Sequence, residues 1–234
     1  MERFIIARQI ANRFYWIKKN LKPINSSHFK KVFFFRVVKP FCDLYYLTYK
    51  KLNPDTPWTS PASIEIFKAL LTKNMKGFEY GSGGSTIFFA SKVKELISIE
   101  HNKEWYEHIS NRLVTEGVKN VTYQFFDKEN DEDYTEETIN IGGQNLQHKF
   151  QKDFYRYVNS INQFDNETFD FIVVDGRARI DCVVRSINKL KSGGLLIVDN
   201  SERDRYQKIK ELLNNWPSIT TSTGLTDTTI WFKI

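Results

Sequence analysis

Four short stretches of the sequence combine residue types that can bind a charged ligand or move a proton. The first is residues 79–84 (EYGSGG), whose glycines permit a tight turn and let a ligand approach main-chain N–H groups. The second is Glu100, which follows Gly81 by 19 residues and can accept two hydrogen bonds from a ribose diol. The third and fourth are Asp175-Gly176-Arg177 and Asp199-Asn200. Together they indicate a site for a ribose-containing ligand beside a pair of acidic residues.

The first stretch departs from the phosphate-binding turn of dinucleotide enzymes. Such turns carry three glycines as Gly-x-Gly-x-x-Gly, and Thr86 stands where the third glycine would be. Glu79, two residues before the first glycine, would repel a pyrophosphate and attract a cationic ammonium group. We therefore favour a ligand that carries an ammonium group over a nicotinamide dinucleotide.

Asp175 and Asp199-Asn200 each follow a predicted strand, and the two aspartates are 24 residues apart. Because the carboxyl ends of parallel strands open on one crevice, we expect these side chains to meet there. Two carboxylates and an amide oxygen are ligands that suit Mg2+ or a similar cation. A second interpretation stays open, in which Asp175 contacts the substrate or the cofactor and the residues around Ser201 cap a helix.

Arg177 and Arg179 bring two cations next to these acidic residues. Arginines can hold an anionic acceptor, such as a carboxylate or a phosphate, in bidentate geometry. They would also compete with a metal ion for the same carboxylates, which favours a site without metal. A solvated helix start is the other interpretation, and the helix dipole disfavours cations there.

The sequence lacks the other common catalytic patterns. Cys42 and Cys182 are the only cysteines, too few for a disulfide framework or a cysteine-based zinc site. His28, His108 and His148 have no ligand spacing, so we interpret them as ordinary surface or core histidines. No Gly-x-Ser-x-Gly, Walker or zinc pattern occurs.

The elements that must position these residues alternate along the chain from residue 76 onward. Helical spacing links Trp105, Ile109 and Leu113, and a second helical pattern runs from Ile180 to Leu190. The predicted strands are short apolar runs: 77–80, 95–100, 121–126, 169–174, 195–198 and, at the C-terminus, 228–234. This alternation predicts an α/β domain with an open, mostly parallel sheet and helices on both faces.

Two further segments complete the prediction for this part of the chain. Residues 127–137 hold seven acidic residues and one Lys, and Gly142-Gly143 follow, so we expect 127–150 to be a solvated insertion after the third strand. Ser201 and Asp204 form a start similar to a capping box for a last helix.

Residues 1–56 are predicted to be a separate, basic, amphipathic helical segment. Residues 1–52 hold twelve Lys and Arg against two acidic residues, a net +10, whereas the rest holds 22 basic and 26 acidic residues, a net −4. One stripe of the first predicted helix is apolar: Ile6, Ile10, Phe14, Ile17 and Leu21. The stripe is expected to pack on the body of the protein or on a second subunit in a homodimer. The third interpretation is that it lies on an anionic membrane surface.

The sequence also bears on compartment and partners. No apolar run reaches the ~18–20 residues that a membrane-spanning helix needs, and the N-terminus lacks the features of a signal peptide. We therefore expect a cytoplasmic protein, either free or peripheral at the inner membrane face. The division of charge is unlike that of a uniformly basic nucleic-acid binder, so no nucleic-acid partner is expected.

Residues 57–234 resemble the class I S-adenosylmethionine-dependent methyltransferases. The motifs that carry the resemblance are Glu79-x-Gly81-x-Gly83, the ribose-binding acid Glu100, the fourth-strand motif 169–176 (FDFIVVDG) and the fifth-strand motif 193–200 (GGLLIVDN). They occur in family order and spacing, and Ser85 replaces a third glycine that many members carry. The resemblance implies a Rossmann-like, seven-stranded, mostly parallel sheet whose last strand, 228–234, is antiparallel.

The resemblance also implies a set of residues that bind S-adenosyl-L-methionine. The implied contacts are Gly81, Ser82 and Gly83 along the methionine part, Glu79 near its ammonium, Glu100 on the ribose diol and His101 facing the adenosine. Asp127, just after the third strand, would hold the adenine amino group. The alternative is that Asp127 only begins the acidic insertion.

The resemblance further implies a reaction. Asp175, Asp199 and Asn200 are similar to the metal ligands of the catechol and caffeoyl-coenzyme A O-methyltransferases. Without a metal, Asp175 would be the general base and Arg177 would orient the substrate. The sequence therefore predicts an enzyme that methylates a small molecule or saccharide at oxygen. Two alternatives stay open: a catalytically inactive, cofactor-binding regulatory protein and, less favoured, a nicotinamide-dependent oxidoreductase.

Overall fold

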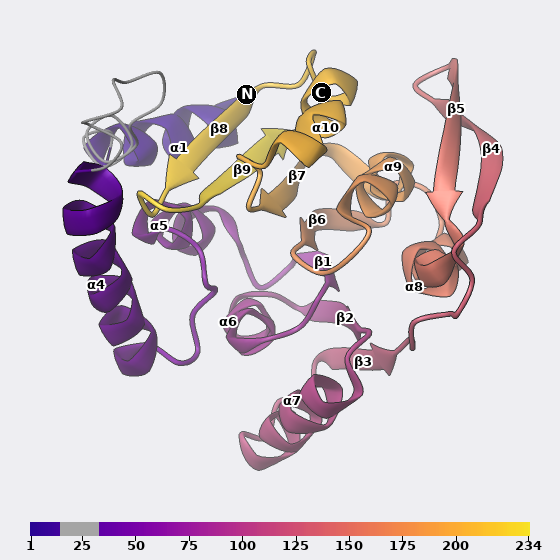
Figure 1. Ribbon diagram of the computed structural model, residues 1–234. Helices are drawn as coiled ribbons and strands as arrows, with labels where there is room; N and C mark the ends of the chain where they lie inside the picture. The colour runs from indigo at the N-terminus through magenta and orange to yellow at the C-terminus, as the bar shows by residue number, and fades with distance from the viewer. Residues whose placement is uncertain (15–32) are drawn as a thin grey trace.

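The structure is a computed structural model that describes residues 1–14 and 33–234. The described residues form a seven-stranded sheet in the order β3-β2-β1-β6-β7-β9-β8 and a separate two-stranded sheet, β4-β5 (Figure 1). The strands of the large sheet are β1 (Lys76–Tyr80), β2 (Glu95–Glu100), β3 (Val121–Phe125), β6 (Phe169–Val174), β7 (Leu190–Asp199), β8 (Ser218–Ser222) and β9 (Asp227–Phe232).

Pairing in the large sheet is parallel except along β9. This strand runs antiparallel to both neighbours, with Ile230 opposite Ile197 of β7 and Ile219 of β8. The predicted mostly parallel sheet with an antiparallel last strand is thus confirmed. The sequence prediction does not include β8, because its run SITTS is mostly polar and shows little apolar signal. Its isoleucine and two threonines are β-branched, which suits a strand that packs beside β9.

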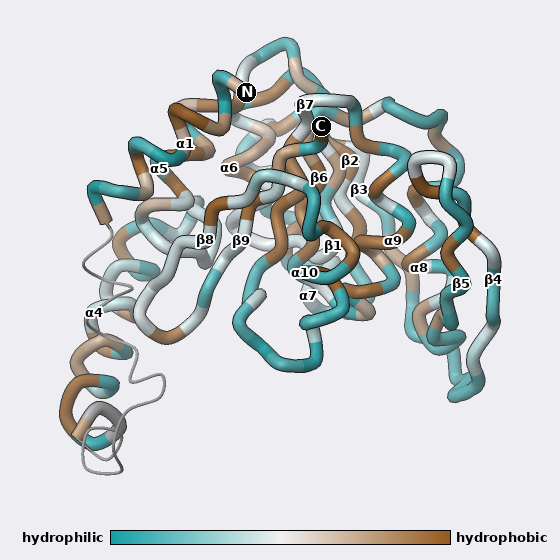
Figure 2. Tube along the Cα trace, turned by 90° about the horizontal axis from the view of Figure 1, so that it is seen from above, coloured by the Kyte–Doolittle hydropathy of each residue, from teal (hydrophilic) through white to brown (hydrophobic). Residues whose placement is uncertain are grey.

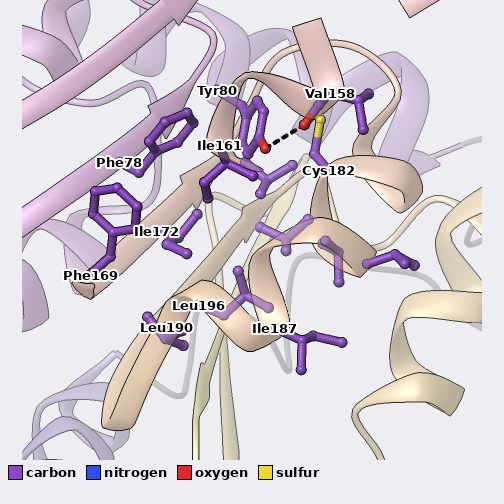
Figure 3. Packing of buried hydrophobic residues seen from close by; sticks show 14 of the residues in the cluster. Phe78, Tyr80, Val158, Ile161, Phe169, Ile172, Cys182, Ile187, Leu190 and Leu196 are labelled. Atoms are coloured by element: carbon purple, nitrogen blue, oxygen red, sulfur yellow. Dashed lines mark hydrogen bonds between the residues drawn. The ribbon is translucent and has the colours of Figure 1, made fainter. Parts of the chain in front are cut away.

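The central strands are buried on both faces because consecutive residues are apolar. On β6, Ile172 and Val174 join one hydrophobic cluster, and Phe171 and Val173 join a second cluster on the other face. The first cluster takes in α8 (Tyr155–Asn159), α9 (Arg179–Lys189) and α10 (Gln207–Leu212), and Figure 3 shows its packing. The second takes in α1 (Glu2–Arg13), α5 (Pro61–Leu70) and α6 (Gly84–Lys92). Helix α7 (Lys103–Thr115) packs near β3.

Part of the segment expected to be a solvated insertion is an ordered β-hairpin. Strand β4 (Tyr134–Ile141) pairs antiparallel with β5 (Gln144–Gln151) along its whole length. Gly142 and Gly143 form the turn with φ values of 57° and 84°, which glycine adopts without strain. Ile139 and Phe150 are buried in the first cluster. The prediction was wrong here because it weighed net charge, whereas apolar residues at alternate positions decide whether a strand packs.

Helix α1 packs against α5 and β8. Ala7 is fully buried in the second cluster, and Ile6 and Ile10 pack against it. This part of the predicted apolar stripe therefore lies on the body of the protein. Ile17 and Leu21, which complete the stripe, lie outside the described residues.

Helix α4 (Lys39–Leu52) follows the π-helical turn η1 (Phe34–Val38) and extends along the side of the molecule (Figure 2). It lies wholly within the described residues, and none of its residues is buried. Across residues 1–14 and 33–234, no helix has the length and apolar composition of a membrane span.

The last helix begins later than predicted. The Ser201 hydroxyl donates to the Asp227 carbonyl at 3.2 Å and lies 2.7 Å from the Thr229 hydroxyl, so it joins the end of β7 to β9. Ser201 therefore does not cap a helix. A 3-10 turn, η4 (Asp204–Tyr206), leads into α10, whose Ile209 is buried.

Candidate active site

A cavity of about 1130 Å3 opens at the carboxyl ends of the parallel strands β1, β2 and β6 and beside the end of β7. Its walls are the turn after β1, the start of α7, the loop after β6, the segment 200–208 and part of β5. Ligands bind at this edge of open parallel sheets. Typical ligand pockets measure about 300–1,000 Å3, so the cavity has room for two small molecules.

The turn after β1 requires glycine at Gly81. Its φ of +91° is left-handed, and a Cβ atom there would lie 2.6 Å from the Gly176 nitrogen and 2.7 Å from its Cα. Ser82 follows, and the Trp105 indole N–H donates to its carbonyl at 2.7 Å. The turn is thus held between the end of β6 and the first turn of α7, with Gly81 and Ser82 in the cavity wall.

Glu100 ends β2 and is fixed by main-chain donors. Its Oε1 accepts the N–H groups of His101 and Asn102 at 2.8 and 2.9 Å, and its Oε2 accepts the N–H of Ser82 at 3.0 Å. The side chain is 4% exposed and lines the cavity. Burial alone would raise the pKa of this carboxyl, but the hydrogen bonds from His101, Asn102 and Ser82 outweigh it and lower the pKa. The Ser82 hydroxyl also donates to Oε2 at 3.1 Å. Glu100 is therefore an ionised, preoriented acceptor, and a ribose hydroxyl that binds it takes the place of the Ser82 hydroxyl.

Glu79 lies beneath the turn, outside the cavity wall. It is fully buried, and its oxygens accept the hydroxyls of Ser85, Thr86 and Ser98 at 2.5–2.6 Å. The Thr86 hydroxyl oxygen in turn accepts the Gly83 N–H at 3.0 Å. Burial raises the pKa of Glu79 to about 7 despite these hydrogen bonds. Glu79 therefore holds the turn from below, and its place near the cofactor ammonium stays a prediction.

Asp127 also lies away from the cavity wall. Asp127 lies two residues beyond the end of β3 and is exposed. Its carboxylate accepts the N–H of Lys128 at 2.8 Å. This position fits the alternative interpretation, in which Asp127 begins the inserted segment. Neither Asp127 nor any residue of β3 lines the cavity, and the adenine contact stays a prediction.

Arg179 joins the ends of β6 and β7 and does not reach out to an acceptor. It is buried, its Nε donates to the Gly176 carbonyl at 3.0 Å, and its Nη2 binds Asp175 Oδ1 at 2.9 Å. Its Nη1 donates to the Asp199 carbonyl. Arg177, by contrast, is exposed in the cavity wall. Of the two arginines predicted to clamp an anion, only Arg177 is available.

The three predicted metal ligands do not form a cation site. Arg179 binds the Asp175 carboxylate, and the Asp199 Oδ1 accepts the Thr228 hydroxyl at 2.7 Å. Asp199 is 6% exposed, and only Asp175 and Asn200 of the three line the cavity. Within the described part of the chain, no three His, Cys, Asp or Glu side chains gather as a metal site requires. The guanidinium supplies the positive charge that a cation would have supplied, so the donor set does not fit a metal ion.

Asp175 is the acidic side chain best placed to move a proton. It begins the loop after β6 in the cavity wall, with 35% of its side chain exposed. Burial, and after it the negative charge of Asp199, raises the pKa of Asp175 above its ordinary range, and the positive charge of Arg179 opposes this rise. A carboxylate with a raised pKa is a stronger base than one in water.

His148, set aside by the sequence analysis, lies in the cavity wall. It is buried on β5, with Nε2 2.7 Å from Asp181 Oδ1 and Nδ1 3.1 Å from the Lys208 ammonium. His148 shares one face of β5 with Leu146 and Phe150, two residues to either side. This strand pattern could have indicated an inward side chain. The prediction of an ordinary histidine rested on ligand spacing alone.

Helix α4 contacts the body of the protein through Tyr46. The Tyr46 hydroxyl donates to the Thr59 carbonyl at 3.3 Å, and burial raises the pKa of this hydroxyl. The Lys50 ammonium lies 3.9 Å from the centre of the Trp58 ring.

The structure therefore divides the predicted site residues into two groups. The cavity wall contains Gly81, Ser82, Glu100, His101, Asp175, Arg177 and Asn200. Three others, Glu79, Gly83 and Asp127, lie outside it, and Asp199 contributes its carbonyl to Arg179.

Comparison with known proteins supports the fold. No protein-family model matches the sequence, and no curated protein matches it. Among solved structures, the chain is similar to a methyltransferase-like protein from Silicibacter pomeroyi, with a TM-score of 0.53 and 19% identity over 76% of this chain and 88% of that one. It is also similar to a putative caffeoyl-CoA O-methyltransferase from Staphylococcus aureus, with a TM-score of 0.54 and 14% identity over 81% of this chain and 91% of that one. At these identities the likeness establishes the fold, and the reaction must be argued from the site.

Proposed function

We propose that this chain, whose fold is that of the class I S-adenosylmethionine-dependent methyltransferases, is an enzyme of that kind and methylates a small molecule or a saccharide at oxygen. One observation carries the proposal. Glu100 is an ionised carboxylate fixed by Ser82, His101 and Asn102 in the wall of a large cavity, beside a turn that only glycine at Gly81 can form. The Glu100 carboxylate suits a ribose diol, and the turn at Gly81 suits the charged methionine part of the ligand that adjoins the ribose.

The residues around Glu100 fit S-adenosyl-L-methionine. Gly81 brings main chain close to the cavity, and Glu100 can accept hydrogen bonds from the ribose hydroxyls. His101, Trp105 and Phe154 add flat rings to the same wall, which suit the adenine. When bound, this cofactor supplies an activated methyl group on its sulfonium.

Asp175 supports transfer to oxygen. A hydroxyl acceptor must lose its proton, and Asp175 is a carboxylate of raised pKa in the cavity wall. Arg177, two residues later in the same loop, is free to orient an acceptor. We assign Asp175 the role of general base and Arg177 the role of orienting the acceptor.

The cofactor assignment is tested by calorimetry with S-adenosylhomocysteine. We expect binding by the intact protein, no binding of NAD, and a loss of about tenfold to a hundredfold in affinity for Glu100→Gln, which removes charge-assisted hydrogen bonds. The matched control is Glu95→Gln, at the partly exposed start of the same strand and outside the cavity wall, which should bind as the intact protein does. Binding of NAD without S-adenosylhomocysteine would instead support an oxidoreductase.

The regulatory alternative needs a second measurement. An inactive cofactor-binding protein would pass the calorimetric test and fail to move a labelled methyl group to any acceptor in a screen of hydroxylated small molecules and saccharides. The cavity space beyond the Glu100 region, together with Asp175 and Arg177, favours an active enzyme.

We also propose that residues 33–52 attach the protein to an anionic membrane surface. Helix α4 turns its apolar side outward: Phe41, Leu44, Tyr45 and Leu52 are 64–76% exposed. At 100° per residue these four side chains fall within one stripe of about 100°. Tyr46, on the opposite face, is partly buried against the body. An outward apolar stripe of this kind requires an apolar partner.

The charge of the same segment favours lipid as that partner. Arg36, Lys39, Lys50 and Lys51 accompany the stripe, and its one acidic residue, Asp43, is 2.6 Å from the Lys39 ammonium. Exposed apolar residues flanked by cations are typical of helices that lie in an anionic interface. A second copy of the same face would bring like charges together.

The membrane proposal is tested by cosedimentation with phosphatidylcholine vesicles that contain or lack phosphatidylglycerol. We expect salt-sensitive binding to the anionic vesicles, and loss of binding in a Phe41→Asp, Leu44→Asp double variant. Val114→Asp, at a residue 81% exposed on α7, is the control that keeps binding. No binding of the intact protein at low salt would refute the proposal. If the double variant instead converts a dimer to a monomer, the stripe is a subunit interface.

A further inference from the structure

One part of the cavity wall is cationic. It is formed by β5, the loop after β6 and the segment after β7, and its cationic side chains are Lys149, Arg177, Arg203, Arg205 and Lys208. Lys208 donates to His148, and the Arg205 guanidinium lies 5.0 Å from the Tyr206 ring centre. Within residues 1–14 and 33–234, none of the five forms an ion pair with a carboxylate.

Some cations elsewhere on the described surface pair with carboxylates: Arg112 pairs with Glu116, for example, and Lys191 with Asp170. The five cations of this wall differ in that they line one cavity together. Three acidic residues that line the same cavity are engaged elsewhere: Asp175 binds Arg179, Asp181 binds His148, and Asp153 lies 3.6 Å from the Lys128 ammonium. Five like charges on three elements repel one another unless an anion lies among them.

We propose that these five side chains form a subsite for a phosphoryl group, and that the methyl acceptor is therefore a small phosphorylated molecule with a free hydroxyl. The inference rests on the proposed methyltransferase function and names its substrate class. A phosphoryl group carries about two negative charges and three acceptor oxygens, so it can engage several cations at once. A single carboxylate is satisfied by one bidentate arginine and would leave the other cations unpaired.

Buried residues hold one of these cations in place. An ammonium can only donate, so Lys208 donates to His148 Nδ1, and the His148 Nε2–H donates to Asp181. Asp181 also accepts the Gln151 N–H at 3.0 Å. His148 and Asp181 are both buried, so they act as positioning residues that direct the exposed Lys208 toward the cavity.

The same wall connects the subsite to the proton acceptor. Arg177 and Asp175 stand two residues apart in one loop, and both line the cavity. A phosphoryl group bound by Arg177 therefore brings a neighbouring hydroxyl of the same molecule toward Asp175. This geometry accounts for a cationic subsite beside a carboxylate base.

The subsite is tested by calorimetry on the full chain saturated with S-adenosylhomocysteine, with sodium pyrophosphate as the probe and sodium acetate at equal ionic strength as the comparison. We expect pyrophosphate to bind and acetate not to bind. An Arg203→Gln, Arg205→Gln double variant should bind pyrophosphate at least about tenfold more weakly, because charge-assisted contacts are lost. Lys210→Gln, at an exposed lysine of α10 outside the cavity wall, is the control and should bind as the intact protein does.

The outcomes separate the two proposals. If S-adenosylhomocysteine binds and pyrophosphate does not, or if the double variant binds pyrophosphate as tightly as the control, the phosphoryl subsite is wrong and the methyltransferase proposal stands. If S-adenosylhomocysteine itself does not bind, the proposed function fails before the anion is added.

Discussion

Asp175 illustrates how a single residue changes role with its neighbours. Beside a metal it would be a ligand, but here the Arg179 guanidinium binds its Oδ1 and also holds the Asp199 carbonyl. We predict that Asp175→Asn lowers kcat by roughly 10²–10⁴, the usual contribution of a general base. We also predict that a chelator leaves the rate unchanged, because Arg179 already supplies the positive charge. Both are measured as transfer of labelled methyl to an acceptor found by screening.

The pH profile checks the same role. Because the pKa of Asp175 is raised, the base is protonated over a wider acidic range, so the rate should rise as pH increases through that raised pKa. Asp165→Asn, at an exposed carboxylate outside the cavity wall, is the control and should keep both rate and profile. Full activity of Asp175→Asn would place the proton acceptor elsewhere.

Glu79 gives a prediction about stability. Its pKa is about 7 in the folded protein and about 4.5 in the unfolded chain, so the folded state binds more protons between these values and loses stability as pH rises through them. Glu79→Gln cannot ionise. We expect the stability of the intact protein, relative to this variant, to fall by roughly 3 kcal/mol between about pH 4.5 and pH 7 and then to level off. Urea unfolding of both proteins across that range measures it; parallel curves would show that Glu79 ionises normally.

At the scale of an element, the turn between β1 and α6 can be tested by adding one methyl group. Gly81→Ala places a Cβ within 2.6–2.7 Å of the Gly176 backbone and also strains a φ of +91°. We predict a loss of more than about tenfold in affinity for S-adenosylhomocysteine, because the displaced turn moves Ser82 away from Glu100. Gly117→Ala is the matched control: its φ is +66°, but a Cβ there meets nothing within 4 Å. The control should show the strain of about 1–2 kcal/mol in stability and no loss of affinity.

At the scale of the whole molecule, α1 and the sheet form one packed unit. Ala7 is fully buried among residues of α5 and the sheet, whereas Ile5 on the same helix is half exposed. We predict that Ala7→Glu costs about 3 kcal/mol and lowers Tm by roughly 6–12 °C, because it buries an unpaired charge. Ile5→Glu should change Tm little. Equal Tm values for both variants in calorimetry would show that α1 is detached from the body, as a separate segment 1–56 requires.

The sequence by itself determined the order of the elements and much of the sheet. Strands such as β2 and β6 are short apolar runs, and helical spacing between them is a local property of consecutive residues. The same local order predicted the turn at Gly81, the acid at Glu100 and the loop at Asp175, since each directly follows a strand and parallel strands end at one edge.

The tertiary structure decided what the side chains contact, because those contacts join residues far apart in the chain. Glu79 is occupied by hydroxyls from α6 and β2, and Arg179 turns inward to the ends of two strands. The β4-β5 hairpin packs so that His148 contacts Asp181, which is 33 residues away in the chain. The same hairpin adds Lys149 to the cationic wall, although the sequence predicted this residue to lie in a solvated acidic insertion. Spacing along the chain can place a residue at a strand end. Only packing across the sheet determines whether that residue faces a ligand, another side chain or solvent.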